Sequence, residues 1–221
     1  MDISGFLKTG KGLTAIIGGG GKTTLLYTLA EELKEKGSII ICTSTHIRIP
    51  EQYPLITGGI DELKAGLPEP VICVGRTAEN GKITAPWISF EELEGLADYV
   101  LVEADGARGL PLKAHAGHEP VIPPNAGKTV LVVGADGFGK KVKEVCHRPE
   151  LWAEIAGVSE EDEAAPESEA EVIGKEGFGD VVFINKAETE EQKAAAGKMA
   201  ALLKVPVIIG SLRYKEYREW P

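Results

Sequence analysis

A run of four glycines followed by Lys-Thr-Thr contains the residue types of this sequence that best suit the binding of phosphate groups and Mg²⁺. The run lies in "LTAIIGGGGKTTLL", residues 13–26, between an apolar stretch and an amphipathic one. In a loop that leads from a strand into a helix, backbone N–H groups wrap phosphates, a Lys contacts the β- and γ-phosphates, and a Thr hydroxyl binds Mg²⁺. The usual spacing, G-x-x-x-x-G-K-[ST], would place its first glycine at position 16, where the chain has Ile16.

Two physical arguments favour a phosphate-binding loop over a flexible turn without a ligand. Successive glycines lose much conformational entropy on folding unless the backbone must turn tightly and approach something closely. Lys22 would also stand at a helix N-terminus, the unfavourable end for a cation unless an anion lies beside it. The predicted ligands of a nucleotide are Gly18, Gly19, Gly20, Gly21, Lys22, Thr23 and Thr24.

A variant loop, G-K-G-G-x-G-K-T-T, occurs in NTPases that insert metals or assemble cofactors. Its second part matches residues 18–24, whereas Ile16 and Ile17 replace its leading Gly-Lys. In that class the early lysine reaches the nucleotide of a partner subunit, so we do not expect this dimer-dependent mechanism here. A monomer and a homodimer both remain open.

Two carboxylates follow an apolar run in "DYVLVEADGARG", residues 98–109. A phosphate-binding loop needs a metal-holding carboxylate at the end of a neighbouring strand. Glu103 and Asp105 are two positions apart and would point the same way on a strand. We expect Asp105 in the Mg²⁺ shell, through water, and Glu103 positioning the metal or a water, so that both join Lys22 in the catalytic set. Carboxylates that merely end a strand are the alternative.

Hydroxyl groups end a second apolar run in "CTSTHI", residues 42–47. Thr43 to His46 would emerge beside the phosphate loop if this strand were the sheet neighbour of the first. Their hydroxyls could then bind Mg²⁺ or a γ-phosphate, as a nucleotide-dependent switch does. We predict Thr45 as a metal ligand together with Thr23, and ordinary turn chemistry is an equal alternative.

A third polar group follows the apolar run that ends in "FINKAE", residues 183–188. Asn185, Lys186 and Glu188 resemble N-K-x-D, the guanine-reading motif of GTPases, with a carboxylate one methylene longer. That carboxylate accepts from groups of guanine that adenine lacks. The motif favours GTP slightly over ATP, and both nucleotides remain open as the cofactor bound with Mg²⁺.

Histidine, cysteine and basic residues gather in "KAHAGHEPVIPP" and "VCHRPE". His115, His118 and Cys146 are residue types that hold soft metals, but the chain has no Cys-x-x-Cys pair. We prefer an anionic substrate or cofactor pocket lined by Lys113, His115, His118 and Arg148. Packing and hydrogen bonding within the loops is the alternative.

The pattern of the whole chain predicts an α/β fold with a mostly parallel sheet flanked by helices. Seven apolar runs are continuous rather than alternating, which is typical of strands buried on both faces. Amphipathic patterns predict helices over 22–37, ended by Gly37, and over 190–204. Asn80-Gly81 between two β-like runs predicts a hairpin at a sheet edge. The apolar runs are residues 13–17, 38–43, 70–75, 98–103, 129–134, 180–185 and 205–210.

The length of 221 residues suits a single P-loop domain over residues 1–221, with a possible small elaboration at 159–179. Within that region, the acidic stretch 159–171 reads as a solvated loop or a short surface helix.

Composition restricts the class of partner. The formal net charge of −10 disfavours broad binding to nucleic acid or to an anionic membrane, although it allows a local basic pocket. No apolar run reaches the roughly 18 residues of a membrane span, and the N-terminus does not read as a signal peptide. Three widely spaced cysteines, Cys42, Cys73 and Cys146, suggest reduced thiols, so we expect a cytoplasmic protein.

The order of these motifs resembles the YqeC family, whose members are described as accessory proteins of selenium-dependent hydroxylases. The resemblance runs from residue 16 to residue 188 and is carried by "AIIGGGGKTT", "TSTHI", "VEADGARGLPLKAHAGHEPVIP", "VVGADGFGKKVKEVCHRPELW" and "INKAE". It implies a P-loop NTPase that helps to mature selenium-dependent molybdenum hydroxylases, with such an enzyme or its cofactor as partner. The chain departs from the family where N-K-x-D is commoner than its Asn-Lys-Ala-Glu.

Three functions fit these residues. The first is slow NTP hydrolysis coupled to insertion or delivery of a cofactor. The second is a nucleotide-gated module that binds a partner without significant turnover. The third is a small-molecule kinase that binds its acceptor through Lys113, His115, His118 and Arg148.

Overall fold

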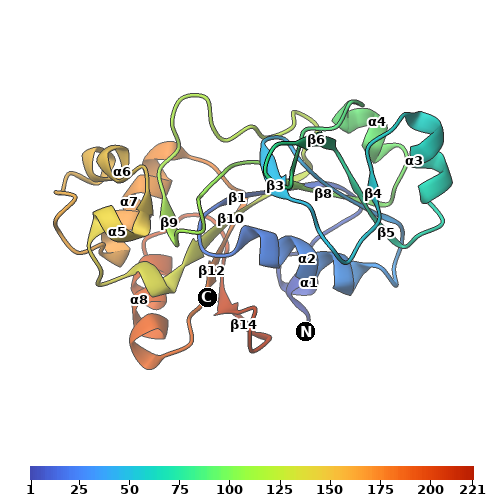
Figure 1. Ribbon diagram of the computed structural model, residues 1–221. Helices are drawn as coiled ribbons and strands as arrows, with labels where there is room; N and C mark the ends of the chain where they lie inside the picture. The colour runs from blue at the N-terminus through green and yellow to red at the C-terminus, as the bar shows by residue number, and fades with distance from the viewer.

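A nine-stranded, mostly parallel sheet forms the centre of the computed structural model, which describes residues 1–221 (Figure 1). The strand order is β14-β13-β12-β10-β1-β8-β2-β5-β4, and only β14 runs antiparallel to its neighbour. The predicted α/β class is confirmed, and each of the seven apolar runs contains a strand of this sheet. The strands are β1 (Gly12–Gly18), β2 (Ile39–Thr43), β4 (Leu55–Ile56), β5 (Val71–Val74), β8 (Tyr99–Glu103), β10 (Lys128–Gly134), β12 (Val181–Asn185), β13 (Val207–Ser211) and β14 (Glu216–Glu219).

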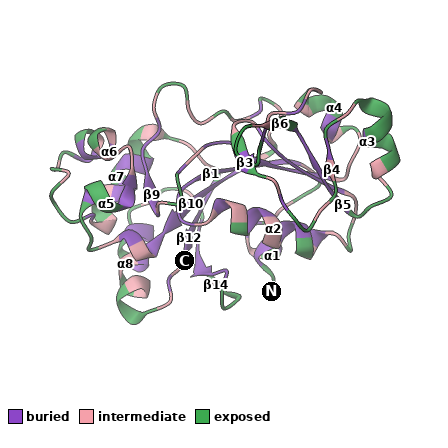
Figure 2. Cartoon of the chain, in the orientation of Figure 1, coloured by how far each residue is buried: buried purple, intermediate pink, exposed green.

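Both faces of the sheet are buried, which explains why its strands are apolar without alternation (Figure 2). Successive side chains of β1 enter different cores: Ala15 and Ile17 join one cluster, and Ile16 joins the other. The Ile16 cluster is covered by α1 (Ile3–Phe6) and α2 (Lys22–Leu33).

The other six α-helices supply buried side chains to the cluster on the opposite face, among them α5 (Val142–Val145). Figure 1 shows α5 to α8 gathered at one end of the sheet and α3 and α4 toward the other. The remaining five of these helices are α3 (Ile60–Gly66), α4 (Phe90–Glu94), α6 (Pro149–Ala156), α7 (Pro166–Glu176) and α8 (Glu190–Ala200). None of the helices combines the length and the apolar character that crossing a membrane requires.

A separate three-stranded antiparallel sheet, in the order β3-β7-β6, contains the predicted hairpin. The strands are β3 (His46–Arg48), β6 (Arg76–Ala78) and β7 (Lys82–Thr84). The turn residues Asn80 and Gly81 both have positive φ, 59° and 66°, as the Asn-Gly pair predicts. The hairpin pairs with β3 and not with β4, the edge strand of the large sheet. Ile47 and Ile83, which face each other across the ladder, anchor the small sheet in the core beneath it.

Helix α2 carries the predicted apolar stripe but ends at Leu33, before the expected end at Gly37. A further turn follows, in which the Lys36 N–H donates to the Leu33 carbonyl. Gly37 instead lets the backbone pass close to the Asp98 carboxylate, with which a Cβ at this position would collide. That carboxylate accepts a hydrogen bond from the Ser38 N–H. Helix α8 likewise ends four residues earlier than its sequence pattern predicts.

The acidic stretch contributes more to the core than the sequence predicted. Pro166 does not interrupt a helix but begins α7 at its first turn, where a proline is favourable. Glu169 of α7 is buried and accepts a hydrogen bond from the indole of Trp152. Burial raises the pKa of Glu169 to about 8, against the smaller lowering effect of the Trp152 hydrogen bond. At neutral pH this carboxyl is therefore mostly uncharged, which lets an acidic segment pack against α6 and α8.

Candidate functional site

The glycine run forms a tight loop between β1 and α2, at the carboxyl end of the central strand. Gly20 requires its residue type, because its φ is +70° and a Cβ would collide with the backbone of Gly134. Ile16, at the position where the usual motif begins, lies inside β1, fully buried and paired with Val130 and Glu103 of the neighbouring strands. The loop therefore starts later than the usual spacing implies, at Gly18.

Lys22, the first residue of α2, folds back over the loop. Its Nζ donates to the carbonyl oxygen of Gly18 at 2.6 Å. The same Nζ lies 3.1 Å from Oδ1 of Asp105 and 3.9 Å from Oε1 of Glu103. The predicted catalytic set, Lys22 with the two carboxylates, is thus assembled at one place.

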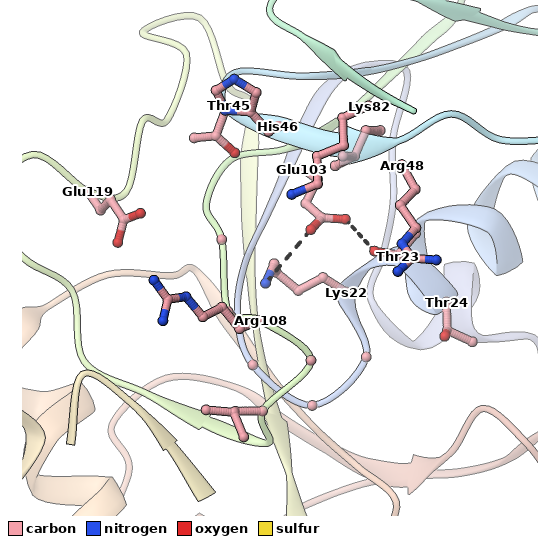
Figure 3. A pocket seen from close by; sticks show the side chains of 18 of the residues that line it. Lys22, Thr23, Thr24, Thr45, His46, Arg48, Lys82, Glu103, Arg108 and Glu119 are labelled. Carbon is pink, nitrogen blue, oxygen red and sulfur yellow. Dashed lines mark hydrogen bonds and ion pairs between the residues drawn. The ribbon is translucent and has the colours of Figure 1, made fainter. Parts of the chain in front are cut away.

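Glu103, the last residue of β8, reaches the first turn of α2. Its Oε2 accepts a hydrogen bond from Thr23 Oγ1 at 2.7 Å, and the carboxylate lines the cavity above the loop (Figure 3). Burial raises the pKa of Glu103, and the charge of Lys22 and the Thr23 hydrogen bond lower it in part. A hydroxyl and a carboxylate oxygen side by side suit Mg²⁺, a hard cation that one or two protein oxygens hold together with substrate phosphates. No group of three or more His, Cys, Asp or Glu side chains is arranged to hold a metal by itself.

Asp105 lies beneath the loop and is completely buried. Its Oδ2 accepts from the Gly18 N–H and contacts Nε2 of His115, both at 2.8 Å, and lies 3.2 Å from Lys113 Nζ. Burial by itself raises the pKa of Asp105, but the His115 hydrogen bond and the charges of Lys22 and Lys113 outweigh it and bring the pKa to about 2. Its Oδ1 forms no hydrogen bond and lies against Lys22 Nζ, and Asp105 does not line the cavity, whereas Glu103 does.

The residues predicted to bind an anionic substrate are brought together, but as an ion-pair network behind the loop. Lys113 is buried and pairs with Glu119 at 3.0 Å, and Arg148 pairs with the same carboxylate at 2.9 Å, with His118 3.3 Å away. Both nitrogens of His115 contact carboxylates, which raise its pKa although burial lowers it. Because none of the four lines the cavity, they are not free to receive an anion there.

The prediction for the hydroxyl groups assumed that β2 is the sheet neighbour of β1, and this assumption is wrong. Strand β8 lies between β1 and β2, and β2 pairs with β8 and β5. Thr43 Oγ1 donates a hydrogen bond to the backbone carbonyl of Glu103, so this hydroxyl already has a partner within the sheet, and Thr43 does not line the cavity. Thr45 and His46 nonetheless line the cavity, so Thr45 stays within reach of a ligand bound at the loop.

A cavity of about 830 Å³ opens above the phosphate loop (Figure 3). Besides the loop, its lining includes Arg48, Lys82 and Arg108, which were absent from the residues predicted from the sequence. For Arg48 and Lys82 the signal was present in "HIR" and "KIT", where alternation places the isoleucine inward and its polar neighbours outward, but such short strands are easily read as turns.

A second, smaller cavity of about 400 Å³ adjoins the other side of the loop at Gly21 and Thr24. Asn185, predicted to bind the base, holds the loop in place: its Nδ2 donates to Gly20 O at 2.8 Å. Lys186 pairs with Asp136, and Glu188 accepts from Ser211 Oγ at 2.8 Å. All three predicted base-reading residues line this second cavity.

We expect replacement of Asp105 by Asn to lower the free energy of unfolding by about 3–5 kcal/mol at pH 7, because it removes the buried anion that Lys22 and Lys113 share. Urea unfolding followed by circular dichroism measures this. Since the pKa of Asp105 is depressed to about 2, its contribution is present above about pH 4 and is lost as the pH falls toward 2. The exposed carboxylate Glu161, replaced by Gln, is the control and should change little. Equal effects of the two substitutions would contradict the assignment.

Comparison with known proteins identifies the family of this chain. The family model described as YqeC protein matches residues 14–150. The uncharacterized protein YqeC of Escherichia coli (strain K12) is 34% identical over 157 residues, which span 66% of this chain and 60% of that protein. Among solved structures, the signal recognition particle 54 kDa protein from Aeropyrum pernix K1 in complex with GDP matches with a TM-score of 0.47 and 15% identity, over 96% of this chain and 44% of that chain. The chain belongs to the YqeC family.

Proposed function

We propose that this protein binds a nucleoside triphosphate together with Mg²⁺ at the loop formed by Gly18 to Lys22. The observation that carries the proposal is the position of the loop, at the carboxyl end of β1 and directly before the N-terminus of α2. Backbone N–H groups and the helix dipole favour an anion at that point. Lys22 and the hydroxyls of Thr23 and Thr24 lie along the same edge of the cavity.

Thr23 and Glu103 are our candidates for holding the metal. Thr23 Oγ1 and Glu103 Oε2 are 2.7 Å apart, so both oxygens would contact one cation once the hydroxyl proton turns away from the carboxylate. Mg²⁺ held there would neutralise negative charge on the phosphates. Thr45 takes the role of an additional, water-mediated contact, and Asp105 holds the loop from below.

Guanine is the base that we propose for the smaller cavity. Asn185, Lys186 and Glu188 line it, and the Glu188 carboxylate accepts from a neighbouring hydroxyl, as a carboxylate that reads N–H donors can. Guanine presents an N1–H and a 2-amino group to such an acceptor, whereas adenine does not.

Turnover is proposed to be slow hydrolysis. Glu103 lines the cavity beside Thr23, where its carboxylate would hold the metal and orient a water toward the phosphates. The nucleotide-gated binding module is the second candidate, because the Glu103 carboxylate is also engaged by Thr23 and Lys22. Measuring phosphate release separates the two.

Replacement of Lys22 by Ala is expected to weaken nucleotide binding by about 2 kcal/mol, or about 30-fold, and to abolish magnesium-dependent phosphate release, because a charge-assisted contact to the phosphates is lost. Isothermal titration and a phosphate-release assay measure the two effects. Lys36, exposed beyond the end of α2, is replaced by Ala as the control. Unchanged binding and turnover in the Lys22 variant would refute the proposal, and tight binding without release in the wild type would favour the gated module.

Replacement of Glu188 by Ala should weaken GTP binding by about 10-fold or more and leave ATP binding nearly unchanged, because the acceptor for the guanine donors is removed. Titration of both nucleotides with Mg²⁺ against wild type and variant measures this difference. Gln at the same position keeps an oxygen acceptor and should show an intermediate loss. Equal affinities for ATP and GTP, unmoved in the variant, would remove the guanine assignment.

Family membership supports a wider role as an accessory factor in maturing selenium-dependent molybdenum hydroxylases, through insertion or delivery of their cofactor. We expect a hydroxylase of this class, produced in cells that lack this chain, to regain activity with the wild type and not with the Lys22→Ala variant. Hydroxylase activity per mole of purified enzyme is the measurement. Full activity without this chain would exclude the role while leaving nucleotide binding intact.

A further inference from the structure

Two cations face each other on the small sheet beside the phosphate loop. Arg48 of β3 and Lys82 of β7 are directly paired in the antiparallel ladder. Ile47 and Ile83, their neighbours, point into the core, so both charged side chains stand on the outer face. Like charges directly opposite each other destabilise a sheet. Both side chains are exposed, so water reduces this repulsion, and an anion bound between them would remove it.

No carboxylate compensates these charges. Neither Arg48 nor Lys82 forms an ion pair, and the same holds for Arg108, although carboxylates are the commoner charge in this chain. The other cations of the cavity, Lys22 and Lys186, do have carboxylate partners. The three unpaired cations thus stand apart as a set within one cavity.

Arg108 approaches the cavity from a different element, the segment after β8. It has a positive φ of 51°, an uncommon backbone conformation for a residue that is not glycine, and its side chain is exposed at the cavity wall. Figure 3 shows Arg108 on one side of Lys22 and Glu103, with Arg48 and Lys82 on the other. The cations therefore surround the space above the loop from two directions.

The size and position of the two cavities leave room for a second ligand. The smaller cavity lies on the Asn185 side of the loop, where we place the base, whereas the cations line the larger one. The larger cavity measures about 830 Å³. Whole small-molecule ligands occupy roughly 300–1,000 Å³, so this space exceeds what the end of a triphosphate needs.

We propose that Arg48, Lys82 and Arg108 form a second anion subsite, which binds a phosphate-bearing small molecule beside the nucleotide. This inference rests on the proposed function, because it places the second ligand across from a nucleotide at the loop. Guanidinium groups hold phosphate oxygens in pairs, and a dianionic phosphate offsets more of three positive charges than a carboxylate does. The chain's net charge of −10 disfavours a nucleic acid as the source of that phosphate.

The test uses phenyl phosphate as the probe and the full chain saturated with Mg²⁺ and a non-hydrolysable GTP analogue. We expect isothermal titration to find one phenyl phosphate per chain. The double variant Arg48→Gln/Lys82→Gln should weaken that binding at least about 10-fold while one nucleotide still binds. The matched control, Lys64→Gln/Lys198→Gln, removes the same charge from exposed positions on α3 and α8 outside the cavity and should bind phenyl phosphate as the wild type does.

Other results would separate this inference from the proposed function. Absence of phenyl phosphate binding to the nucleotide-bound protein would overturn the subsite and leave nucleotide binding standing. Loss of nucleotide binding in the Arg48→Gln/Lys82→Gln variant would assign these cations to the nucleotide itself and also overturn it. If the wild type binds no nucleotide, the proposed function fails. In that case phenyl phosphate is titrated against the Lys22→Ala variant, in which it cannot bind through Lys22. Binding to this variant that disappears when Arg48→Gln/Lys82→Gln is added supports the subsite. Absence of binding to the Lys22→Ala variant overturns it.

Discussion

A single buried carboxylate beneath the phosphate loop organises the residues around it. Asp105 accepts from the Gly18 N–H and contacts His115, Lys22 and Lys113, which come from the loop, the first turn of α2 and β9 (Leu112–Lys113) with the segment that follows it. An ion without water needs every one of its partners, because an unpaired charge in the interior is very costly. The loop, α2 and the segment after β9 are thereby held in one arrangement, which places Lys22 and Glu103 at the cavity.

The order of the strands explains where the cavity lies. Strands β1 and β8 are adjacent, so the loop after β1 and the Glu103 carboxylate at the end of β8 meet at one edge of the sheet. Strand β2 follows on the far side of β8, and the chain leaving it forms β3 of the small sheet. Ligand sites of parallel α/β sheets lie at the carboxyl ends of the strands for the same reason. The small sheet then covers one flank of the cavity with Arg48 and Lys82.

Charge is distributed unevenly over this acidic protein. Most basic residues near the site are neutralised: Lys113 and Arg148 share Glu119, and Lys186 pairs with Asp136. Arg48, Lys82 and Arg108 of the large cavity differ in that they form no ion pair and gather around one space, in a chain with more carboxylates than amines and guanidinium groups. A local positive field inside an acidic surface attracts small anions and repels extended polyanions, which narrows the class of ligand.

The sequence by itself determined the elements and the loop, because these follow from local patterns. Continuous apolar runs predicted the buried parallel strands, Asn80-Gly81 predicted the hairpin, and the glycines with Lys22 predicted the tight loop between β1 and α2. Tertiary structure alone decided which carboxylate lies under the loop and which faces the cavity, since Glu103 and Asp105 are chemically alike and differ only in their surroundings. It also decided that His115 is held between carboxylates, and that Arg48 and Lys82 meet, because pairing of distant segments depends on strand order and register, which no local pattern contains.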